Sequence, residues 1–531
     1  MLKDRVYLYD STLRDGAQTS TVNFSVRDKQ EIALMLDELG IDYIEGGWPG
    51  ANATDDEFFE NLPKLKKSIF TAFGMTKRSG NSVENDPLLN SVINSKAGSI
   101  CIFGKSWNFH LKHALNISEE ENFELIAHSI AHIKNRGKEA MFDAEHFFDG
   151  YKNNPDFALK CVQTAYQNGA RWIILCDTNG GTLPSEIGKI VTEVKKYIPG
   201  KNLGIHCHND TGNAVANSIA AVEAGARHVQ GTINGLGERC GNANLTTLIP
   251  TLMLKMNYDV GVSEQQLKNL VKVSNFLNDL LCKPRDPFAP YVGEFAFAHK
   301  GGAHVSAIAK NPKSYEHIEP EKVGNSRKIM VSDQSGRANI ISRLKDIGLH
   351  QSDNIKYSQI SDLVNKVKEL ENKGYAYDSA DASFEVLAKR FLSVVPVFFE
   401  LLSFKVVDQR TVNNAQEDNP IITSEAEIKI RIDGKIVKSS SSGNGPVNAL
   451  DIALRKALWN KYPILENIRL TDYKVRILTP SDGTQAITRV QIESTDDKGN
   501  KWSTIGVSSN IVNASYRALR DSITFKLMKE Y

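Results

Sequence analysis

The sequence lacks the patterns that mark several protein classes. Its six cysteines are scattered, with no Cys-x-x-Cys pair, which argues against the disulfide framework of a small secreted domain and favours reduced thiols. No run approaches the roughly twenty apolar residues of a membrane span. The start passes directly into the short apolar run 6–9, without the apolar stretch and cleavage site of a signal peptide. We therefore expect a soluble, cytoplasmic protein with no membrane partner.

A charge excess of one sign is also absent. Lys plus Arg is 64 and Asp plus Glu is 63, which leaves a formal net charge of +1 over 531 residues. Such a balance gives no general attraction to nucleic acid or to an anionic membrane, so we expect neither as a partner. A small anionic substrate would need a local site. The length allows roughly three to four average domains, or one large barrel with an appended module.

From residue 6 to about 257, short apolar runs alternate with longer amphipathic stretches, which is the pattern of strand–helix units around a parallel sheet. Eight successive units favour a closed (β/α)8 TIM barrel, in which polar residues at the strand ends carry the chemistry. The expected strands are Val6–Asp10, Ile41–Trp48, Ile69–Gly74, Ser99–Gly104, Ala140–His146, Trp172–Asp177, Leu203–His208 and His228–Asn234.

Two further regions follow the barrel, predicted over residues 1–257. Residues 258–394 have helical spacing, at 267–281 and 360–370, and are expected to form a helical connector or lid that contributes to the active site. Residues 395–531 change to alternating strands and contain a repeat, because Val447-Asn448-Ala449 recurs as Val512-Asn513-Ala514. We interpret this α+β region as two copies of a hairpin followed by a helix. It is either a regulatory domain that senses an amino acid or a purely structural dimerisation domain.

The segment 203–210 holds two histidines at the end of an expected strand. Alternate residues of a strand share one face, so the imidazoles of His206 and His208 point the same way. A His-x-His pattern also arises by chance. In a closed barrel the first and seventh strand ends lie near each other, and Asp15 can then complete a two-histidine, one-carboxylate site for a divalent cation. The alternative is a surface loop in which Asp15 forms a weak ion pair with Arg14.

Five segments together resemble the Claisen-condensing branch of the DRE-TIM metallolyase superfamily, which includes 2-isopropylmalate, homocitrate and citramalate synthases. A sixth segment, 44–50 with 53–55, is most similar to the citramalate synthases, and the resemblance covers nearly the whole chain. The five segments are Ser11–Gly16, Asp143–Glu145, Asp177–Gly180, His206–Asp210 and Asn234–Asn242.

The resemblance implies a role for each strand-end residue. Asp15, His206, His208 and Asn242 would hold a divalent metal cation (Mg, Mn, Zn or Co), although Asn242 can also simply stabilise a turn. Arg14 would stabilise a developing oxyanion. Thr178 would bind the substrate carboxylate, with a helix cap as its alternative role. Glu145 would position or shuttle protons, with an ordinary ion pair as the alternative. These residues complete the expected barrel site.

Carbon-acid chemistry needs a base that the barrel does not supply. The resemblance implies that His304 and Tyr315 enter the site from the segment after the barrel, with Asn311 as a substrate-binding neighbour. His299 is a rival for the histidine role, but the small residues before His304 fit the family pattern better. In the family this segment reaches a neighbouring subunit, so the resemblance implies a homodimer.

The function implied by the resemblance is an acyltransferase that condenses acetyl-CoA, as co-substrate, with pyruvate and hydrolyses the thioester to (R)-citramalate and CoA. It would serve isoleucine biosynthesis, with isoleucine as a possible effector at the C-terminal domain. One alternative is a 2-isopropylmalate synthase, which accepts the bulkier 2-oxoisovalerate. Another, from a different class, is a catalytically silent barrel that binds amino acids as a regulatory protein.

Overall fold

The computed structural model describes residues 3–331, 337–349, 355–411 and 421–531. These residues divide into two compact units, the first comprising residues 1–297 and 318–326 and the second comprising 298–317 and 327–531. Each unit is described by itself. Within the described ranges, none of the helices combines the length and the apolar character that crossing a bilayer requires.

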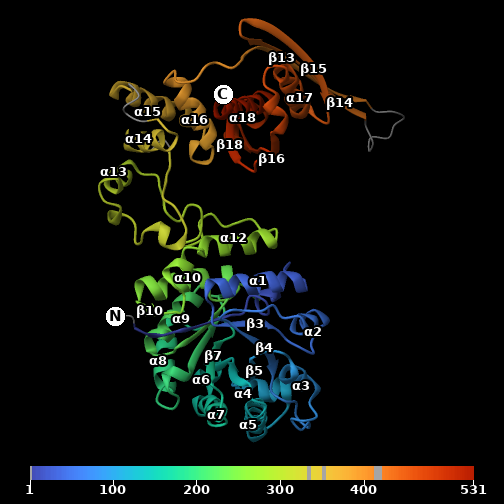
Figure 1. Ribbon diagram of the computed structural model, residues 1–531, viewed down its shortest axis with the longest axis vertical. Coiled ribbons are helices and arrows are strands. Elements are labelled where there is room, and N and C mark those ends of the chain that lie inside the picture. Colours follow the sequence, from blue (N-terminus) through green and yellow to red (C-terminus); the bar gives the residue numbers. More distant parts are fainter. Residues whose placement is uncertain (1–2, 332–336, 350–354, 412–420) are drawn as a thin grey trace. The chain divides into compact units, whose positions relative to one another are not determined.

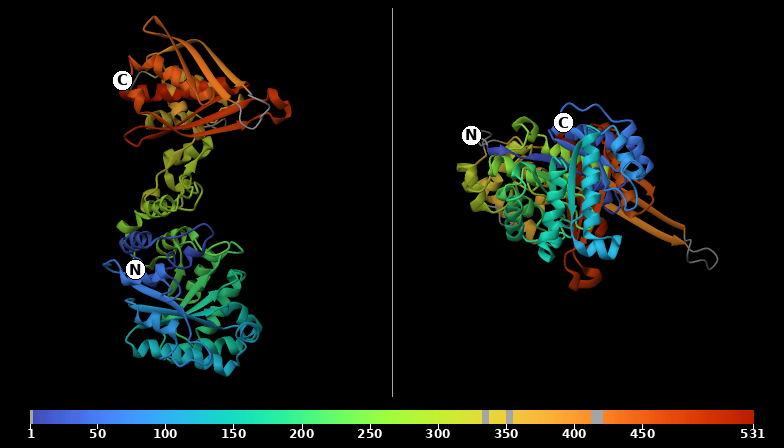
Figure 2. Two further views of the ribbon diagram at one scale, coloured as in Figure 1. Left: turned by 90° about the vertical axis from the view of Figure 1, so that its right-hand side faces the viewer. Right: turned by 90° about the horizontal axis from the view of Figure 1, so that it is seen from below.

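The first unit is a closed barrel of eight parallel strands, as the sequence predicts. Figure 1 and Figure 2 show the strands enclosed by helices. All eight expected strands are present and pair in chain order, with the first strand next to the eighth. The strands are β2 (Tyr7–Asp10), β3 (Tyr43–Gly47), β4 (Ile69–Met75), β5 (Ser99–Lys105), β6 (Glu139–Glu145), β7 (Trp172–Asp177), β8 (Leu203–Cys207) and β9 (His228–Gly231).

Helices cover the outside of the barrel. Their ends carry the expected stop and start signals: Ser25 caps the first helix in a capping box with Asp28, and Gly40 ends it in the left-handed region. The main helices are α1 (Val26–Leu39), α2 (Ala53–Glu60), α3 (Pro87–Asn94), α5 (Glu119–Asn135), α7 (Pro155–Gln167), α8 (Pro184–Val194), α9 (Ala214–Ala224) and α10 (Leu245–Pro250). Smaller or later elements of this unit are β1 (Lys3–Arg5), α4 (Asn108–His110), α6 (Phe147–Asn153), β10 (Tyr258–Asp259), α11 (Glu264–Leu267) and α12 (Leu270–Leu280).

The barrel buries two apolar layers. Aliphatic side chains fill the space between strands and helices, whereas the interior is filled mainly by aromatic and sulfur-containing side chains. Filling the interior makes it a solid core that holds the strand ends at fixed spacing. The interior cluster comprises Tyr9, Tyr43, Phe73, Cys101, Met141, Trp172, Ile174 and Cys176.

The second unit begins with helices and ends with a duplicated module. The expected helical segments 267–281 and 360–370 correspond to α12 in the first unit and to α15 in the second. The helical part contains β11 (Ala298–His299), α13 (Gly302–Lys310), β12 (Lys328–Ile329), α14 (Arg337–Asp346), α15 (Tyr357–Asn372) and α16 (Asp381–Phe391).

The repeat has one more strand per copy than the sequence interpretation gave it. Each copy is a three-stranded antiparallel sheet followed by a helix, so the interpretation of a hairpin and a helix was incomplete. The expected hairpins themselves are confirmed, with Asp433 and Gly434 at positive φ in the turn of the first. The copies are β13 (Glu400–Thr411), β14 (Ile421–Ile432), β15 (Lys435–Gly443) and α17 (Pro446–Trp459), then β16 (Arg469–Ile477), β17 (Thr488–Thr495), β18 (Lys501–Ser508) and α18 (Ile511–Glu530).

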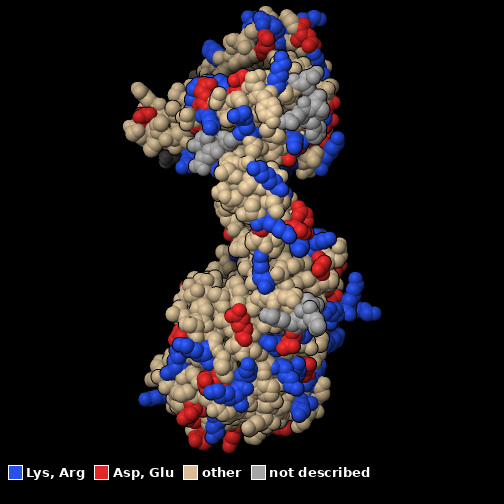
Figure 3. Space-filling view, turned by 90° about the vertical axis from the view of Figure 1, so that its left-hand side faces the viewer, with Lys and Arg blue, Asp and Glu red and all other residues tan. Residues whose placement is uncertain are grey.

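Lys and Arg side chains are interspersed with Asp and Glu over the face that Figure 3 shows. This mixture agrees with the formal net charge of +1.

Candidate functional site

A cavity of about 260 Å³ lies at the carboxyl ends of the barrel strands. This is the end at which TIM barrels place their chemistry. Its lining combines ionisable side chains with aromatic ones. The lining residues are Arg14, Asp15, Gln18, Trp48, Phe73, Phe103, Asp143, Glu145, Cys176, Thr178, His206, His208 and Glu238.

The structure brings Asp15, His206 and His208 together in this cavity. The two Nε2 atoms lie 3.4 Å apart. The Asp15 carboxylate oxygen Oδ2 lies 3.6 Å from Nε2 of His206 and 4.0 Å from Nε2 of His208. His208 lies just beyond the end of β8, where its backbone bridges to Asn242, yet its ring still faces the same point as that of His206.

The electrostatics of this cluster favour the protonation states that bind a cation. Burial raises the pKa of Asp15, but Arg14 and the two imidazoles outweigh it and lower that pKa to about 2. Burial and the neighbouring His206 lower the pKa of His208 to about 4. Near neutral pH the carboxylate is therefore ionised and His208 is neutral. A buried carboxylate facing two imidazoles is a donor set that suits a divalent cation.

Asn242 lies beside the cluster. Its side chain helps to lower the pKa of Asp15, and its Nδ2 donates to the backbone oxygen of Leu236 at 3.0 Å. Its Oδ1 and Asp15 Oδ1 are both buried without a hydrogen-bond partner among the described residues. Unsatisfied buried oxygens beside the cluster are what a cation would satisfy.

Arg14 is held over the cavity by a buried carboxylate. Its Nε donates to Oε2 of Glu45 at 2.8 Å, and its Nη1 lies 3.3 Å from Oδ2 of Asp15. The guanidinium carbon lies 3.8 Å from the centre of the Phe73 ring. Glu45 also accepts from Tyr9 and Ser11. The sequence marks Glu45 only as a polar strand-end residue, and its role in fixing Arg14 appears in the tertiary contacts.

A chain of buried hydrogen bonds fixes the His206 ring. Its Nδ1 lies 2.8 Å from Oε1 of Gln230, and Nε2 of Gln230 donates to Oδ1 of Asp143 at 3.1 Å. The Cys101 thiol donates to the same Asp143 oxygen at 3.2 Å. A Gln230 oxygen that accepts from Nδ1 places the imidazole proton there and leaves Nε2 free for a cation. Sequence reasoning missed Gln230, because it follows no motif and lies on a different strand, β9.

Glu145 and Thr178 line the same cavity. The carboxylate of Glu145 pairs with Lys105. The Thr178 hydroxyl accepts the backbone N–H of His146 at 2.8 Å, which leaves its own proton available to a ligand.

An aromatic wall closes part of the cavity. Trp48 packs edge-on against Phe73 and Phe103, with ring centres 5.7 Å and 5.8 Å away. Phe73 and Phe103 stack on each other at 5.5 Å. We call these three residues the aromatic wall. Together with the small volume, it restricts the size of the ligand that fits.

The remaining predicted residues belong to the second unit. The rings of His304 and Tyr315 stack with centres 4.3 Å apart, and both side chains are exposed. Asn311 lies between them in sequence, and its side chain caps the following turn by accepting from Lys313 N. The rival His299 is engaged elsewhere, because its Nε2 lies 3.3 Å from Oε1 of the buried Glu316.

Three protein families match successive regions of the chain. Residues 5–276 match the HMGL-like family. Residues 291–375 match the homocitrate synthase post-HMGL domain-like family, and residues 378–527 match the LeuA allosteric (dimerisation) domain. The chain is 49% identical to the (R)-citramalate synthase of Aquifex aeolicus over 100% of its own length and 99% of that protein. The chain belongs to the (R)-citramalate synthase family.

The chain is also similar to further (R)-citramalate synthases and, at lower identity, to 2-isopropylmalate synthases. The chain is 48% identical to the (R)-citramalate synthase of Geobacter sulfurreducens, over 99% of the chain and 98% of that protein. The 2-isopropylmalate synthase of Methanocaldococcus jannaschii is 32% identical, over 99% of the chain and 96% of that protein. The resemblance stated from the sequence motifs is confirmed by these relatives.

Proposed function

We propose that this protein is an acyltransferase that condenses acetyl-CoA with pyruvate and hydrolyses the thioester to release (R)-citramalate and CoA. The observation that carries the proposal is 42–49% identity to five (R)-citramalate synthases over 99–100% of the chain. The small cavity with its aromatic wall supports a small 2-oxo acid as substrate.

Asp15, His206 and His208, with Asn242 beside them, are the residues that would hold a divalent metal cation. A bound divalent cation supplies Lewis-acid polarisation of the substrate keto group. The mixed oxygen and nitrogen donor set suits Mg, Mn, Zn or Co. Chelator treatment should therefore abolish activity, and adding back these metals should restore it to different extents.

The cavity side chains act on pyruvate in complementary ways. Thr178 donates its free hydroxyl proton to the substrate carboxylate. Arg14 is charged at any working pH and stabilises the oxyanion that forms when the keto carbon is attacked. Glu145 receives or returns the proton that moves during addition and hydrolysis. Arg14, Glu145 and Thr178 all line the cavity, so each can reach a substrate bound there.

The acetyl methyl group needs a base that removes a proton from carbon. His304, held against the Tyr315 ring, takes this proton. The deprotonated methyl carbon of acetyl-CoA then attacks the keto carbon of pyruvate. Water finally cleaves the thioester. His304 is exposed and forms no ion pair with another described residue, whereas His299 lies beside Glu316, and this supports His304 as the base. These side chains come from the segment 298–317 of a partner subunit in a homodimer, and the LeuA dimerisation match supports that association.

The test is thiol release from acetyl-CoA with a panel of 2-oxo acids, with and without chelator. We expect metal-dependent release that is fastest with pyruvate. Fastest release with 2-oxoisovalerate would instead identify a 2-isopropylmalate synthase. If no 2-oxo acid gave release of CoA in the presence of added metal, the chain would be the silent amino-acid-binding regulator.

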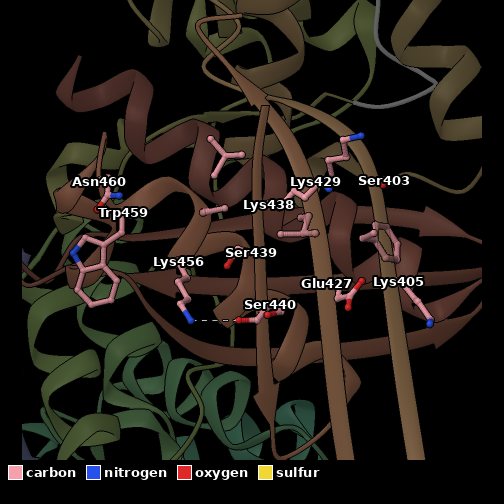
Figure 4. A pocket seen from close by; sticks show the side chains of 14 residues that line it. Ser403, Lys405, Glu427, Lys429, Lys438, Ser439, Ser440, Lys456, Trp459 and Asn460 are labelled. Carbon is pink, nitrogen blue, oxygen red and sulfur yellow. Dashed lines mark hydrogen bonds between the residues drawn. The ribbon is translucent and has the colours of Figure 1, made fainter. Parts of the chain in front are cut away.

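We propose further that the duplicated module binds isoleucine as a feedback effector of isoleucine biosynthesis. A pocket of about 1030 Å³, shown in Figure 4, lies between the first sheet of the module and α17. Its lining offers an apolar floor with charges of both signs, which suits a zwitterion that has an aliphatic side chain. The floor includes Phe404, Ile428 and Val437, and charged neighbours include Lys456 and Glu427.

Lys456 is the position at which to test this pocket. Its Nζ donates to the backbone oxygen of Ser440 at 3.5 Å, so its replacement removes little structure. Lys456→Gln should weaken inhibition by isoleucine at least tenfold while leaving uninhibited activity unchanged. Lys501→Gln, at an exposed lysine of the second copy of the module, is the matched control. Loss of the response in the control but not in Lys456→Gln would contradict the assignment.

A further inference from the structure

The turn that ends β3 separates two residues of the barrel site. Glu45 lies in the strand, and Trp48 of the aromatic wall directly follows it. Glu45 and Gly47 pair with two consecutive residues of β4, so β3 has one extra residue here, which is a β-bulge. A bulge changes the direction of the chain and of the side chains beside it. The geometry of this turn therefore decides where the Trp48 ring lies.

Gly47 is the residue that this turn requires. Its φ of +144° lies in a region that residues with a side chain rarely adopt. A Cβ atom at this position would overlap the carboxyl group of Asp55 in α2. The Asp55 carboxylate and the backbone of the turn are thus packed against each other with no space for a side chain at position 47.

A buried ion pair holds the backbone on both sides of Gly47. Lys29 of α1 pairs with Asp55 of α2, and the two residues are 4% and 7% exposed. Nζ of Lys29 donates to the backbone oxygen of Gly46 at 2.9 Å. Oδ2 of Asp55 accepts the backbone N–H of Trp48 at 2.8 Å. Side chains from two helices therefore fix the turn through its own backbone atoms.

Stability alone does not account for a charged pair at this position. Replacing a buried ion pair by apolar side chains of similar volume is often neutral or stabilising. Apolar side chains could not hydrogen-bond to the Gly46 oxygen and the Trp48 N–H, and these two bonds orient the turn. The described residues that line the cavity include Trp48 but neither Lys29 nor Asp55, so the pair acts on the cavity through the turn.

We propose that Lys29 and Asp55 are positioning residues that hold Trp48 in the aromatic wall and so restrict the cavity to a small 2-oxo acid. The inference rests on the proposed function, because it concerns the substrate cavity of that reaction. Glu45, on the other side of the turn, is also held by Tyr9 and Ser11. Loosening the turn should therefore move Trp48 more than Glu45, and change substrate selectivity more than turnover of pyruvate.

Asp55→Asn and a matched control, Asp42→Asn, test this inference in the full-length protein. Asp42 also pairs with a cation, Arg5, and accepts a backbone N–H, that of Leu8, at 2.9 Å. The side chains of Asp55 and Asp42 are 10% and 11% exposed, and Asp42 lies at the opposite end of β3 from the cavity. An asparagine has one acceptor oxygen where an aspartate has two, so each variant loses one of these contacts.

Steady-state thiol release from acetyl-CoA gives kcat and KM for pyruvate and for 2-oxoisovalerate. In Asp55→Asn we expect the ratio of kcat/KM for 2-oxoisovalerate to that for pyruvate to rise about fivefold or more, with kcat for pyruvate within about threefold of wild type. In Asp42→Asn the ratio should stay at the wild-type value. Lys29→Met/Asp55→Ala removes both backbone contacts without leaving an unpaired charge, so it gives the same readout if Asp55→Asn does not fold.

Trp48→Leu shows whether the effect passes through Trp48. It should raise the ratio by itself, and adding Asp55→Asn to it should give no further rise. A further rise of the same size, or an equal ratio in Asp55→Asn and Asp42→Asn, would overturn the inference while leaving the proposed function intact. A wild type that releases no CoA, or that prefers 2-oxoisovalerate, would contradict the proposed function and this inference with it.

Discussion

At the residue scale, the barrel site depends on side chains that the motifs do not name. Asp15, His206 and His208 form the candidate metal cluster, but Gln230 sets the proton position on His206 and Glu45 holds Arg14. Such supporting contacts determine whether ligands keep the right tautomer and direction.

Replacement of Gln230 should weaken metal binding. In Gln230→Leu the His206 Nδ1 proton loses its acceptor, and we expect metal affinity to fall about 10–100-fold. Gln230→Glu keeps the acceptor for His206 but loses the N–H that Asp143 accepts, so its metal affinity should lie between those of wild type and Gln230→Leu. Competition with a chromophoric chelator measures affinity independently of catalysis. Thr71→Val, which removes a buried hydrogen bond to Ser99 elsewhere in the barrel, is the control. Equal losses in Gln230→Leu and Thr71→Val would mean that Gln230 has only a structural role.

The aromatic wall should control the size of the 2-oxo acid. Phe103→Ala opens space beside Trp48 and Phe73, and we expect the ratio of kcat/KM for 2-oxoisovalerate to that for pyruvate to rise about tenfold or more. Steady-state thiol release with both acids measures the ratio. Phe109→Ala, an exposed aromatic residue beyond the same strand, is the control. An unchanged ratio in Phe103→Ala would show that the aromatic wall does not limit the size of the 2-oxo acid.

At the element scale, the barrel strands also supply the side chains that fill the barrel interior beneath the site. His228, the first residue of β9, is fully buried between Tyr9, Tyr43 and Trp172. Both of its ring nitrogens lack a hydrogen-bond partner among the described residues. The ring therefore behaves as a neutral aromatic side chain inside the barrel.

This burial makes stability depend on pH. Burial, with a contribution from Arg171, lowers the pKa of His228 from 6.5 to about 3. Below pH 6.5 the unfolded chain takes up a proton that the folded barrel does not, so stability is complete above pH 6.5 and declines as the pH falls. The expected loss from this group is about 1.4 kcal/mol per pH unit. Denaturant unfolding of His228→Gln between pH 7 and 5 should show a shallower decline than wild type, whereas the exposed His113→Gln should not differ.

The repeat shows why element prediction was incomplete. The sequence predicted the two hairpins from their turns, but not the preceding strands β13 and β16. In β16, Leu470, Val475 and Ile477 are 40%, 45% and 57% exposed, so its apolar residues do not mark a buried face. A strand that is mostly exposed lacks the alternation that identifies strands in a sequence.

At the scale of the whole molecule, the proposed reaction needs residues from both units. The candidate metal cluster is in the first unit, whereas His304 and Tyr315 are in the second. If His304 acts on the barrel of a partner subunit, defects in the two units should complement each other.

Mixed dimers test this arrangement. Asp15→Asn and His304→Ala should each be nearly inactive alone. Equal amounts, dissociated and reassociated at random, should recover about one quarter of wild-type activity, because half of the dimers are mixed and each mixed dimer has one intact site. Size-exclusion chromatography with two affinity tags would verify that mixed dimers form. Mixed dimers without activity would place His304 and Asp15 of the same subunit in one site.

The barrel, the repeat and the shared direction of His206 and His208 could be predicted from the sequence, because they follow from periodicity and from neighbours along one strand. The position of Asp15 near the two histidines could also be predicted, once the eight strands were placed in order around a closed barrel. Gln230 beside His206 and the aromatic wall were found only in the tertiary structure. These features join residues far apart in the chain. Their contacts depend on strand order, register and helix packing, which no local pattern encodes.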